Sequence, residues 1–380
     1  MAVREQVPLS GYTTLGLGGP AARFIEADSD EEVLAAVRAA DHGGEPVLVL
    51  GGGSNLVVPD QGFPGTVIRM LTRGVRVLKD DDAVVVTAAA GEDWDPLVER
   101  CITDSLSGVE CLSGIPGLAG ATPIQNVGAY GQEVAETIVA VRAYDRAHGL
   151  VVDMANADCG FGYRTSVFKR AAGPAAAGPA APLAATGRFV VLGVTFRLSR
   201  DPLSAPLRYG ELARSLGAGQ GGRLPLADVR AAVLQLRRRK GMVLDRDDPD
   251  TRSAGSFFTN PVLDQGQLTA LEQAIAVVCG PGAQIPRYAA GGGQVKVSAA
   301  WLIEHAGFAK GYPGNGSRPD GKPVEMTRGP RISTKHTLAL VNPGGSSTKE
   351  LLDLATEITD GVRETFGVEL VREPVLVAAG

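Results

Sequence analysis

Apolar positions recur at helical spacing in four segments of the chain. In the first segment, Asp28 or Ser29 can cap the opening turn of a helix. In the third, Val229, Val233 and Leu236 fall on one face, and a basic cluster follows them. The predicted helices cover residues 28–44, 94–106, 226–240 and 348–367.

Short apolar runs rich in β-branched residues predict strands between these helices. The predicted strands cover residues 46–50, 82–91, 189–198, 337–342 and 374–379. Strands that alternate with helices and glycine loops favour α/β or α+β domains.

Two stretches interrupt this alternation. Residues 170–188 are nearly all Ala, Pro and Gly, a composition that cannot build a packed core, so we interpret them as a surface insertion or a flexible loop. Residues 311–331 are a second loop-rich stretch. Neither stretch is expected to contribute to the core.

The length and charge of the chain narrow the class of protein. A chain of 380 residues usually folds into two or three domains. The net charge of −5 argues against a broad basic surface, so we expect no nucleic-acid partner. No apolar run approaches the roughly 18 residues of a membrane span, and the first residues lack an apolar signal region. We therefore expect a cytoplasmic protein without membrane insertion.

The cysteines indicate neither a metal site nor a disulfide framework. Cys101, Cys111, Cys159 and Cys279 lie far apart, and none forms a CxxC pair. We expect reduced structural thiols and no bound metal.

Glycine-rich stretches suggest a phosphate-bearing ligand. Residues 16–21, GLGGPA, match the GxGxxA pattern, but Pro20 stands where the fingerprint helix should open, which disfavours a Rossmann site. Residues 50–55, LGGGSN, follow a predicted strand and fit either an anion-binding nest or a tight turn. Residues 113–131 are a second, longer passage of this kind. Two such nests together suggest one extended dinucleotide.

Ser256, in the stretch SAGSFFTNP, raises a question of chemistry. A nucleophilic serine needs a base, but no GxSxG motif surrounds it and none of the histidines lies near it in sequence. A Ser-His-Asp triad is therefore disfavoured. The histidines are His42, His148, His305 and His336.

Two cationic stretches leave their role open. Residues 163–164 read YR, and residues 237–240 read RRRK at the end of a predicted helix. A solvated helix end is the favoured interpretation of the second stretch before other evidence is added.

Taken in order, a set of segments resembles the UDP-N-acetylenolpyruvoylglucosamine reductase family, flavoenzymes of peptidoglycan precursor synthesis. The ordered set spans nearly the whole chain. It comprises TTLGLGGPA, LGGGSNLVV, SGIPGLAGATPIQNVGAYG, FGYRTSVFK, YGEL, SAGSFFTNP, AAWLIEHAGFAKG and EPVLV.

The resemblance implies an α+β fold with a vanillyl-alcohol-oxidase-type FAD-binding unit of two subdomains and a C-terminal substrate-binding domain. Residues 1–75, completed by 366–380, would form the first subdomain. Residues 76–205, with the insertion 170–188, would form the second. Residues 206–365 would bind the substrate, and we expect a monomer.

The resemblance also implies FAD as cofactor and NADPH as co-substrate. Because residues 51–56 contain neither His nor Cys, the FAD is expected to be non-covalent. The residues expected to contact FAD are Gly51, Gly52, Gly53, Ser54, Asn55, Ser113, Gly114, Ile115, Pro116, Gly117, Gly120, Gln125, Asn126, Gly128, Ala129 and Tyr130.

The implied reaction carries hydride from NADPH to FAD and then to UDP-N-acetylenolpyruvoylglucosamine, giving UDP-N-acetylmuramate. By resemblance, Arg164 and Glu373 stabilise the enolate-like intermediate, and Ser256 donates the proton. Glu369 is a nearby rival to Glu373, and Thr259 stands where relatives commonly have lysine. The residues expected to bind substrate are Tyr163, Tyr209, Lys240 and Asn260.

Overall fold

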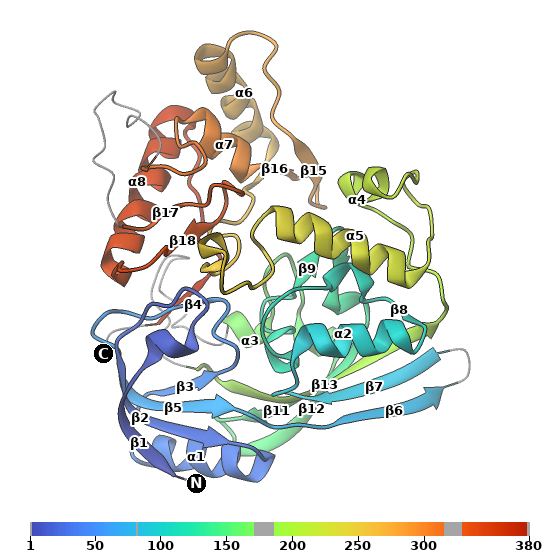
Figure 1. Ribbon diagram of the computed structural model, residues 1–380, viewed down its shortest axis with the longest axis vertical. Helices are drawn as coiled ribbons and strands as arrows, with labels where there is room; N and C mark the ends of the chain where they lie inside the picture. The colour runs from blue at the N-terminus through green and yellow to red at the C-terminus, as the bar shows by residue number, and fades with distance from the viewer. Residues whose placement is uncertain (1, 81–82, 171–185, 315–328, 378–380) are drawn as a thin grey trace.

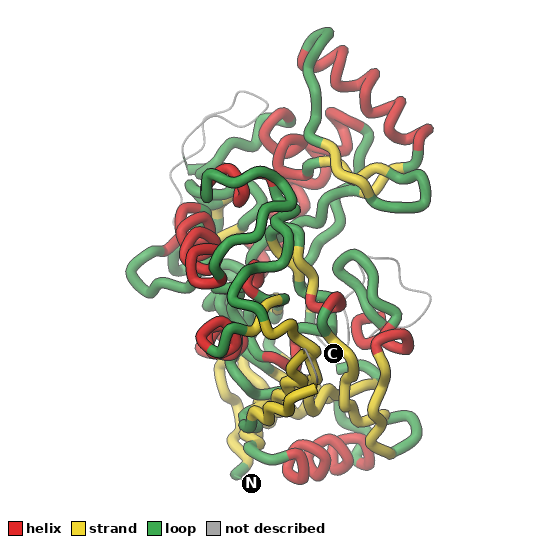
Figure 2. The backbone as a smooth tube through the Cα atoms, turned by 90° about the vertical axis from the view of Figure 1, so that its right-hand side faces the viewer, coloured by secondary structure: helices red, strands yellow, loops and turns green. Residues whose placement is uncertain are grey.

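The computed structural model describes residues 2–80, 83–170, 186–314 and 329–377. The Ala/Pro-rich stretch 170–188 falls mostly on 171–185, and the loop-rich stretch 311–331 mostly on 315–328, so both expectations lie largely outside the described residues. Two sheets occupy the lower half of the molecule, and the helices of the C-terminal half lie above them (Figures 1 and 2).

The first sheet has the strand order β1-β2-β5-β3, with β2, β5 and β3 parallel and β1 antiparallel at one edge. Its strands are β1 (Val3–Pro8), β2 (Pro20–Ala27), β3 (Val47–Leu50) and β5 (Phe63–Met70). Because Pro20 opens a strand and not a helix, the rejection of a Rossmann fingerprint over residues 16–21 is confirmed. The predicted strand that runs into the glycines is confirmed as β3, which ends directly before Gly51.

Helix α1 (Asp30–His42) lies below this sheet in both views of the backbone and confirms the first predicted helix (Figures 1 and 2). The Ser29 side chain accepts a hydrogen bond from the Glu32 N–H and so caps the first turn. Val33 and Val37 point into the core and are fully buried.

The second sheet is antiparallel, with the order β12-β11-β13-β7-β6 and β8 paired to β13. Its strands are β6 (Val75–Asp80), β7 (Ala83–Ala89), β8 (Leu106–Ser107), β11 (Ile138–Asp145), β12 (Leu150–Ala155) and β13 (Phe189–Arg200). Helix α2 (Trp94–Thr103) packs against it, and the indole of Trp94 donates to the Leu112 carbonyl at 3.1 Å. The largest core cluster draws on both sheets, α1 and α2.

The C-terminal half is mainly helical. Its helices are α4 (Gly210–Ser215), α5 (Leu226–Arg239), α6 (Gln265–Cys279), α7 (Ala299–His305) and α8 (Thr348–Phe366). Val229, Val233 and Leu236 are buried on one face of α5, as their spacing predicts. Ser347 and Glu350 form a capping box at the start of α8.

Short strands and one short helix complete the fold. The predicted strand 337–342 is wrong in extent: only Leu340–Val341 forms a strand, because the Ala339 N–H donates to the His336 carbonyl in a turn and so is not free to pair with a neighbouring strand. The short helix is α3 (Val167–Arg170). The short strands are β4 (Leu56–Val57), β9 (Gly128–Ala129), β10 (Gln132–Glu133), β14 (Val262–Leu263), β15 (Arg287–Ala289), β16 (Val295–Val297), β17 (Arg331–Ile332), β18 (Leu340–Val341) and β19 (Val375–Leu376).

The end of the chain returns to its beginning. Strand β19 pairs in parallel with β4, which directly follows the first glycine-rich loop. This pairing brings the residues before β19, including Glu373, to the edge of that loop. Within the described part of the chain, every helix is too short or too polar to cross a membrane.

Candidate active site

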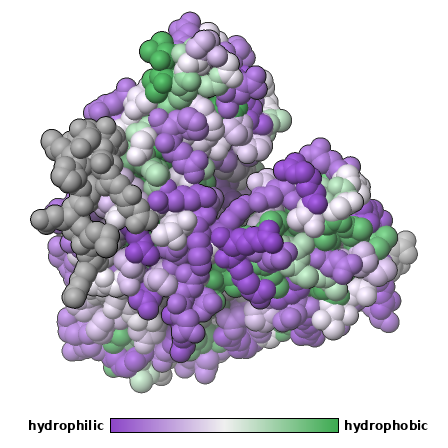
Figure 3. Space-filling model, turned by 45° about the horizontal axis from the view of Figure 1, so that its top comes forward, coloured by the Kyte–Doolittle hydropathy of each residue, from purple (hydrophilic) through white to green (hydrophobic). Residues whose placement is uncertain are grey.

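A cavity of about 270 Å³ lies where loops from both sheets meet the C-terminal segment. It adjoins a more apolar cavity of about 150 Å³, with which it shares Val49, Gly51 and Leu118. The space-filling view shows a groove lined by hydrophilic residues between two lobes of the surface (Figure 3). A polar chamber beside an apolar slot suits an elongated ligand that has both a charged and a flat apolar part.

The two glycine-rich loops form one wall of the larger cavity. The Asn55 side-chain amide donates to Gln125 Oε1 at 2.8 Å, and the Ser54 hydroxyl donates to the Pro116 carbonyl at 3.2 Å. A Cβ atom added to Gly52 would lie 2.8 Å from the Gly117 Cα. The loops are therefore in direct contact, as a shared ligand would require.

The backbone at position 53 requires a glycine. Its φ is +61°, and an added Cβ would lie 1.9 Å from the Tyr12 carbonyl oxygen. A side chain here would therefore both strain the backbone and push the loop away from its support. The tight packing leaves the backbone as the ligand-facing surface.

Most of the residues expected to contact FAD line one of the two cavities. Gly120 lines the apolar cavity, where an added Cβ would clash with Ala90. The expected FAD contacts that line the larger cavity are Gly51, Gly52, Gly53, Ser54, Asn55, Ile115, Pro116, Gln125 and Gly128.

The remaining expected residues line neither cavity. Ser113 is fully buried, and its hydroxyl donates to the Glu110 carbonyl at 2.7 Å. Asn126 is also buried, and its amide donates to Glu133 Oε2 at 2.7 Å. These side chains brace the loop. The others that do not line the cavity are Gly114, Gly117, Ala129 and Tyr130.

Arg164 and Glu373 form an ion pair in the cavity. Arg164 Nε lies 3.0 Å from Glu373 Oε1, although the geometry at Nε is not that of a hydrogen bond. One Nη atom of Arg164 donates to the Gly128 carbonyl at 2.8 Å, and Arg164 itself has φ +54°, an uncommon value for a non-glycine residue. The guanidinium is thereby held in one place.

Backbone pairing sets Ser256 beside Glu373. The Glu373 N–H donates to the Phe257 carbonyl at 2.9 Å, and the Thr259 N–H donates to the Val371 carbonyl at 2.9 Å. Ser256 lines the same cavity and is partly exposed. The structure thus brings together the three residues expected to carry the chemistry, which come from distant parts of the chain.

Burial shifts the ionisation of the groups around this pair. Burial raises the pKa of Glu373, although Arg164 and Lys169 oppose the shift. Burial also lowers the pKa of Lys169, against the attraction of Glu373. Such opposed groups in one cavity are typical of sites that handle protons and developing charge.

The expected substrate-binding residues fall into two groups. Tyr209 packs edge-on against Tyr130, with ring centroids 5.4 Å apart. Lys240 pairs with Glu211 at 2.7 Å, and its ammonium lies 5.8 Å from the Tyr130 ring. Tyr209, Tyr130 and Lys240 therefore form one cluster.

The second group lies next to Arg164. The Lys296 ammonium lies 4.2 Å from the centre of the Tyr163 ring. Asn260 is committed in part to structure, because its Oδ1 accepts from the Ala299 N–H at the start of α7.

Sequence reasoning missed three cations of this site. Lys169 donates to the carbonyls of Arg164 and Glu373, Lys296 lies over Tyr163, and Arg237 lines the larger cavity. The interpretation of residues 237–240 as a solvated helix end is wrong for Arg237, because α5 turns this residue inward. The signal that could have identified Lys169 is the FGYRTSVFK segment, in which this lysine lies five residues after Arg164.

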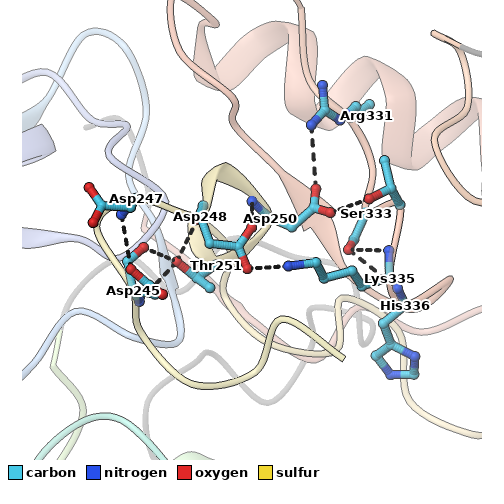
Figure 4. A network of polar contacts seen from close by, with 10 residues as sticks. Asp245, Asp247, Asp248, Asp250, Thr251, Arg331, Ser333, Lys335 and His336 are labelled. Atoms are coloured by element: carbon cyan, nitrogen blue, oxygen red, sulfur yellow. Dashed lines mark hydrogen bonds and ion pairs between the residues drawn. The ribbon is translucent and has the colours of Figure 1, made fainter. Parts of the chain in front are cut away.

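A polar network anchors the segment that leads to Ser256 (Figure 4). Asp248 pairs with Lys335, and Asp250 pairs with Arg331 at 3.4 Å. Asp250 is 3% exposed, so this contact lies largely out of solvent. The network ties the loop before Ser256 to the segment around β17.

Two family models match the chain. A model described as a FAD binding domain matches residues 21–155. A model described as the C-terminal domain of UDP-N-acetylenolpyruvoylglucosamine reductase matches residues 247–377. The first range contains both glycine-rich loops, and the second contains Ser256 and Glu373. Together with the mixed sheets and helices, these matches confirm the predicted α+β class with a FAD-binding unit.

Close relatives span nearly the whole chain. The UDP-N-acetylenolpyruvoylglucosamine reductase of Thermobifida fusca is 55% identical over 98% of this chain and 97% of its own. That of Streptomyces coelicolor is 52% identical over 98% and 90%. A crystal structure of UDP-N-acetylenolpyruvylglucosamine reductase from Thermus caldophilus, 24% identical, covers 99% of this chain and 100% of its own with a TM-score of 0.58, which shows the same fold. This chain therefore belongs to the UDP-N-acetylenolpyruvoylglucosamine reductase family.

Proposed function

We propose that this reductase converts UDP-N-acetylenolpyruvoylglucosamine to UDP-N-acetylmuramate, with non-covalent FAD and with NADPH as hydride donor. The observation that carries the proposal is the Arg164–Glu373 ion pair beside Ser256 in the cavity that the glycine-rich loops close. When bound, FAD supplies the redox chemistry that links NADPH to the enolpyruvyl group.

The residues present suit FAD. The paired loops present backbone at Gly52 and Gly53, where an added Cβ atom would collide with neighbouring backbone, so a diphosphate can approach the chain closely. Residues 51–56 offer neither His nor Cys for a covalent bond. The apolar cavity lined by Leu48 and Phe189 suits an aromatic ring system.

Arg164 and Glu373 have the task of stabilising negative charge on the substrate. Addition of hydride to one alkene carbon leaves an enolate-like carboxylate, which a fixed guanidinium can bind through two donors. Burial raises the pKa of Glu373, so this carboxyl takes up a proton more readily than a free one and can share a hydrogen bond with the developing charge. The pair therefore offers both a permanent cation and an acid.

In this proposal, Ser256 donates the proton that the second alkene carbon receives. A hydroxyl is a weak acid, but the enolate carbon is a strong base, so a close and oriented donor suffices. The backbone pairing through Phe257 holds the serine in place. Among the described residues no histidine lines this cavity, and the proposed role needs none, because the serine donates a proton and attacks no carbon.

Lys240 and Tyr209 are proposed to bind the diphosphate of the substrate, and Tyr163 and Asn260 to contact its remainder. Lys240 is already held by Glu211 at 2.7 Å, a contact that an entering diphosphate would replace or share. The domain limits at residues 75, 205 and 365 stay predictions, as do the monomeric state and the cytoplasmic location.

Two other functions of the same fold compete with this proposal. One is a flavin-binding module without activity, and the other is an oxidase acting on a different substrate. The joint presence of Arg164, Ser256 and Glu373 in one cavity favours the reductase over the idle module. The cluster of Tyr209 and Lys240 favours a diphosphate substrate over the oxidase.

A product assay distinguishes the three. Purified protein is incubated with NADPH and UDP-N-acetylenolpyruvoylglucosamine, and the nucleotide sugar is analysed by mass spectrometry. The proposal predicts a product two mass units heavier, formed one for one with NADPH consumed. NADPH oxidation that needs oxygen and leaves the nucleotide sugar unchanged would instead identify an oxidase, and no NADPH oxidation would identify the idle module.

A further inference from the structure

Lys169 joins two segments of the active site that are far apart in the sequence. Its ammonium donates to the carbonyl of Arg164 at 3.4 Å and to the carbonyl of Glu373 at 3.5 Å, although Glu373 lies 204 positions further along the chain than the lysine. The side chain also lines both the larger and the apolar cavity. Lys169 is therefore in contact with both residues that are proposed to stabilise the developing charge.

The local fold holds the backbone of Lys169 in place. Lys169 belongs to the short helix α3, whose first turn is capped by the fully buried Ser166. The Ser166 hydroxyl accepts from the N–H groups of Phe168 and Lys169 and donates to the Ile124 carbonyl at 2.5 Å. Phe168 is buried and packs edge-on against Phe189, with ring centroids 5.8 Å apart. The helix is thereby anchored to the second glycine-rich loop and to the core.

The Arg164 turn has a backbone conformation that needs support. Arg164 has φ +54°, in the left-handed region that residues other than glycine seldom adopt. One Nη atom of its side chain donates to the Gly128 carbonyl at 2.8 Å, and the Lys169 ammonium donates to its backbone carbonyl. A residue without a donor at position 169 would remove one hydrogen bond from Arg164 and one from Glu373, so the two segments would be free to shift apart.

The ammonium also places a positive charge near the Glu373 carboxyl. In the described part of the chain, the charges that act on Glu373 are those of Arg164 and Lys169, and Tyr163 is the other titratable side chain coupled to it. The segment SAGSFFTNP, which pairs with the Glu373 segment, contains no acidic or basic side chain. Burial raises the pKa of Glu373, and the two cations oppose this rise. Removal of the lysine charge should therefore strengthen proton binding by Glu373.

We propose that Lys169 is a positioning residue for reduction of the substrate: it holds the Arg164 turn against the Glu373 segment, so that the guanidinium and the carboxyl meet the developing charge together. The inference rests on the proposed roles of Arg164 and Glu373. Lysine suits this task because its three donors reach two carbonyls at once and its charge strengthens both hydrogen bonds. Lys169 acts through these two residues and gives no proton to the substrate.

The test compares FAD-saturated holoenzymes carrying Lys169→Met, Lys169→Gln and, as matched control, Lys349→Met, which alters an exposed lysine of α8 that pairs with Asp353. Anaerobic stopped-flow absorbance follows flavin reduction by NADPH and then reoxidation by UDP-N-acetylenolpyruvoylglucosamine, at a series of pH values. Lys169→Met should slow reoxidation on the order of 10–100-fold, as expected for a small misplacement of catalytic groups, and should change flavin reduction little. Lys349→Met should match wild type in both steps.

The pH profile of reoxidation separates this role from a merely structural one. With Glu373 acting as an acid, reoxidation slows as the pH rises through the pKa of this carboxyl, because the carboxyl is then ionised. Lys169→Met and Lys169→Gln both remove the cation, so the decline should move to higher pH in each variant. Lys169→Gln keeps a donor and should recover part of the rate, but the decline should stay displaced.

Three results would overturn the inference. A wild-type rate and profile in Lys169→Met would show that the lysine does not support the pair. Slower reoxidation with an unmoved pH profile in both variants would leave it a structural role only. Weaker FAD binding with normal kinetics at saturating FAD would assign it to the cofactor. If Lys169→Met does not fold, an unmoved profile in Lys169→Gln overturns the inference as well. Failure of the proposed function is distinct, because reduced wild-type flavin would then not be reoxidised by the nucleotide sugar.

Discussion

The backbone N–H of Glu373 donates to the carbonyl of Phe257 at 2.9 Å, and this bond sets the C-terminal segment beside the segment that follows Ser256. Phe258 and Arg372 continue the pairing as an isolated bridge. Ser256, the proposed proton donor, and Glu373, the acidic partner of Arg164, are therefore positioned by the main chain. Substitution of their side chains should leave this frame in place, so each function can be tested separately.

Ser256→Ala should separate the two halves of the reaction. Reduction of the flavin by NADPH needs no proton from Ser256, whereas substrate turnover should fall on the order of 10²–10⁴-fold. Stopped-flow absorbance measures the first step and product formation the second. Thr259→Val is a nearby control that should keep both. Parallel loss of both steps in Ser256→Ala would assign the serine a structural or flavin-side role.

Glu373→Gln and Glu369→Gln form a matched pair. Glu369 is exposed, whereas Glu373 lies 3.0 Å from Arg164 in the cavity. Glu373→Gln should reduce turnover on the order of 10²-fold or more while flavin reduction persists, because the amide cannot donate a proton to the developing charge as an acid does. Glu369→Gln should resemble wild type. The reverse pattern would transfer the role to Glu369.

Gly53→Ala should release FAD. Its Cβ would lie 1.9 Å from the Tyr12 carbonyl oxygen, so the loop must move. Gly44→Ala is the control, because Gly44 has a similar φ, +67°, but open space around it, and should cost only about 1 kcal/mol of backbone strain. The flavin-to-protein absorbance ratio after gel filtration measures the effect. Full retention of FAD in Gly53→Ala would show that this loop is not the cofactor's support.

Asp145 should make folding stability sensitive to acid. Hydrogen bonds from Arg188, and then from His148 and the Ala147 N–H, hold the pKa of Asp145 well below its usual range. Because the folded-state pKa is depressed, the stabilisation is present above the unfolded value of about 3.9 and is lost as the pH falls below it. Asp145→Asn should therefore destabilise the protein at pH 6 and progressively less toward pH 3.

Urea unfolding at several pH values measures this difference. Asp153→Asn, on the neighbouring strand β12, removes an exposed partner of Arg142 and should change stability little at any pH. A destabilisation by Asp145→Asn that stays constant from pH 6 to pH 3 would contradict the role given to its charge.

Local signals in the sequence predict four of the described helices, α1, α2, α5 and α8, but not α6 and not the site. Ser29 and the apolar spacing around Val233 predict α1 and α5, because capping and burial of one face act within a few residues. The expectation of a solvated helix end is wrong for Arg237, because the position of this residue depends on the distant Gly114 loop, which packs over α5. A basic last turn is the same local pattern whether it faces solvent or a cavity.

The resemblance to a known family supplied what local patterns could not. Ser256 and Glu373 are 117 positions apart, and only the backbone pairing through Phe257 shows why they meet. Contacts between distant segments decide this meeting, and periodicity carries no record of such contacts.

An anaerobic two-step spectrum tests the proposed reaction most directly. Purified protein should show the absorbance of oxidised flavin, and one equivalent of NADPH should bleach it. Addition of UDP-N-acetylenolpyruvoylglucosamine, without oxygen, should then restore the band as UDP-N-acetylmuramate forms in equal amount. A flavin that stays bleached until air is admitted would contradict the assignment of this substrate.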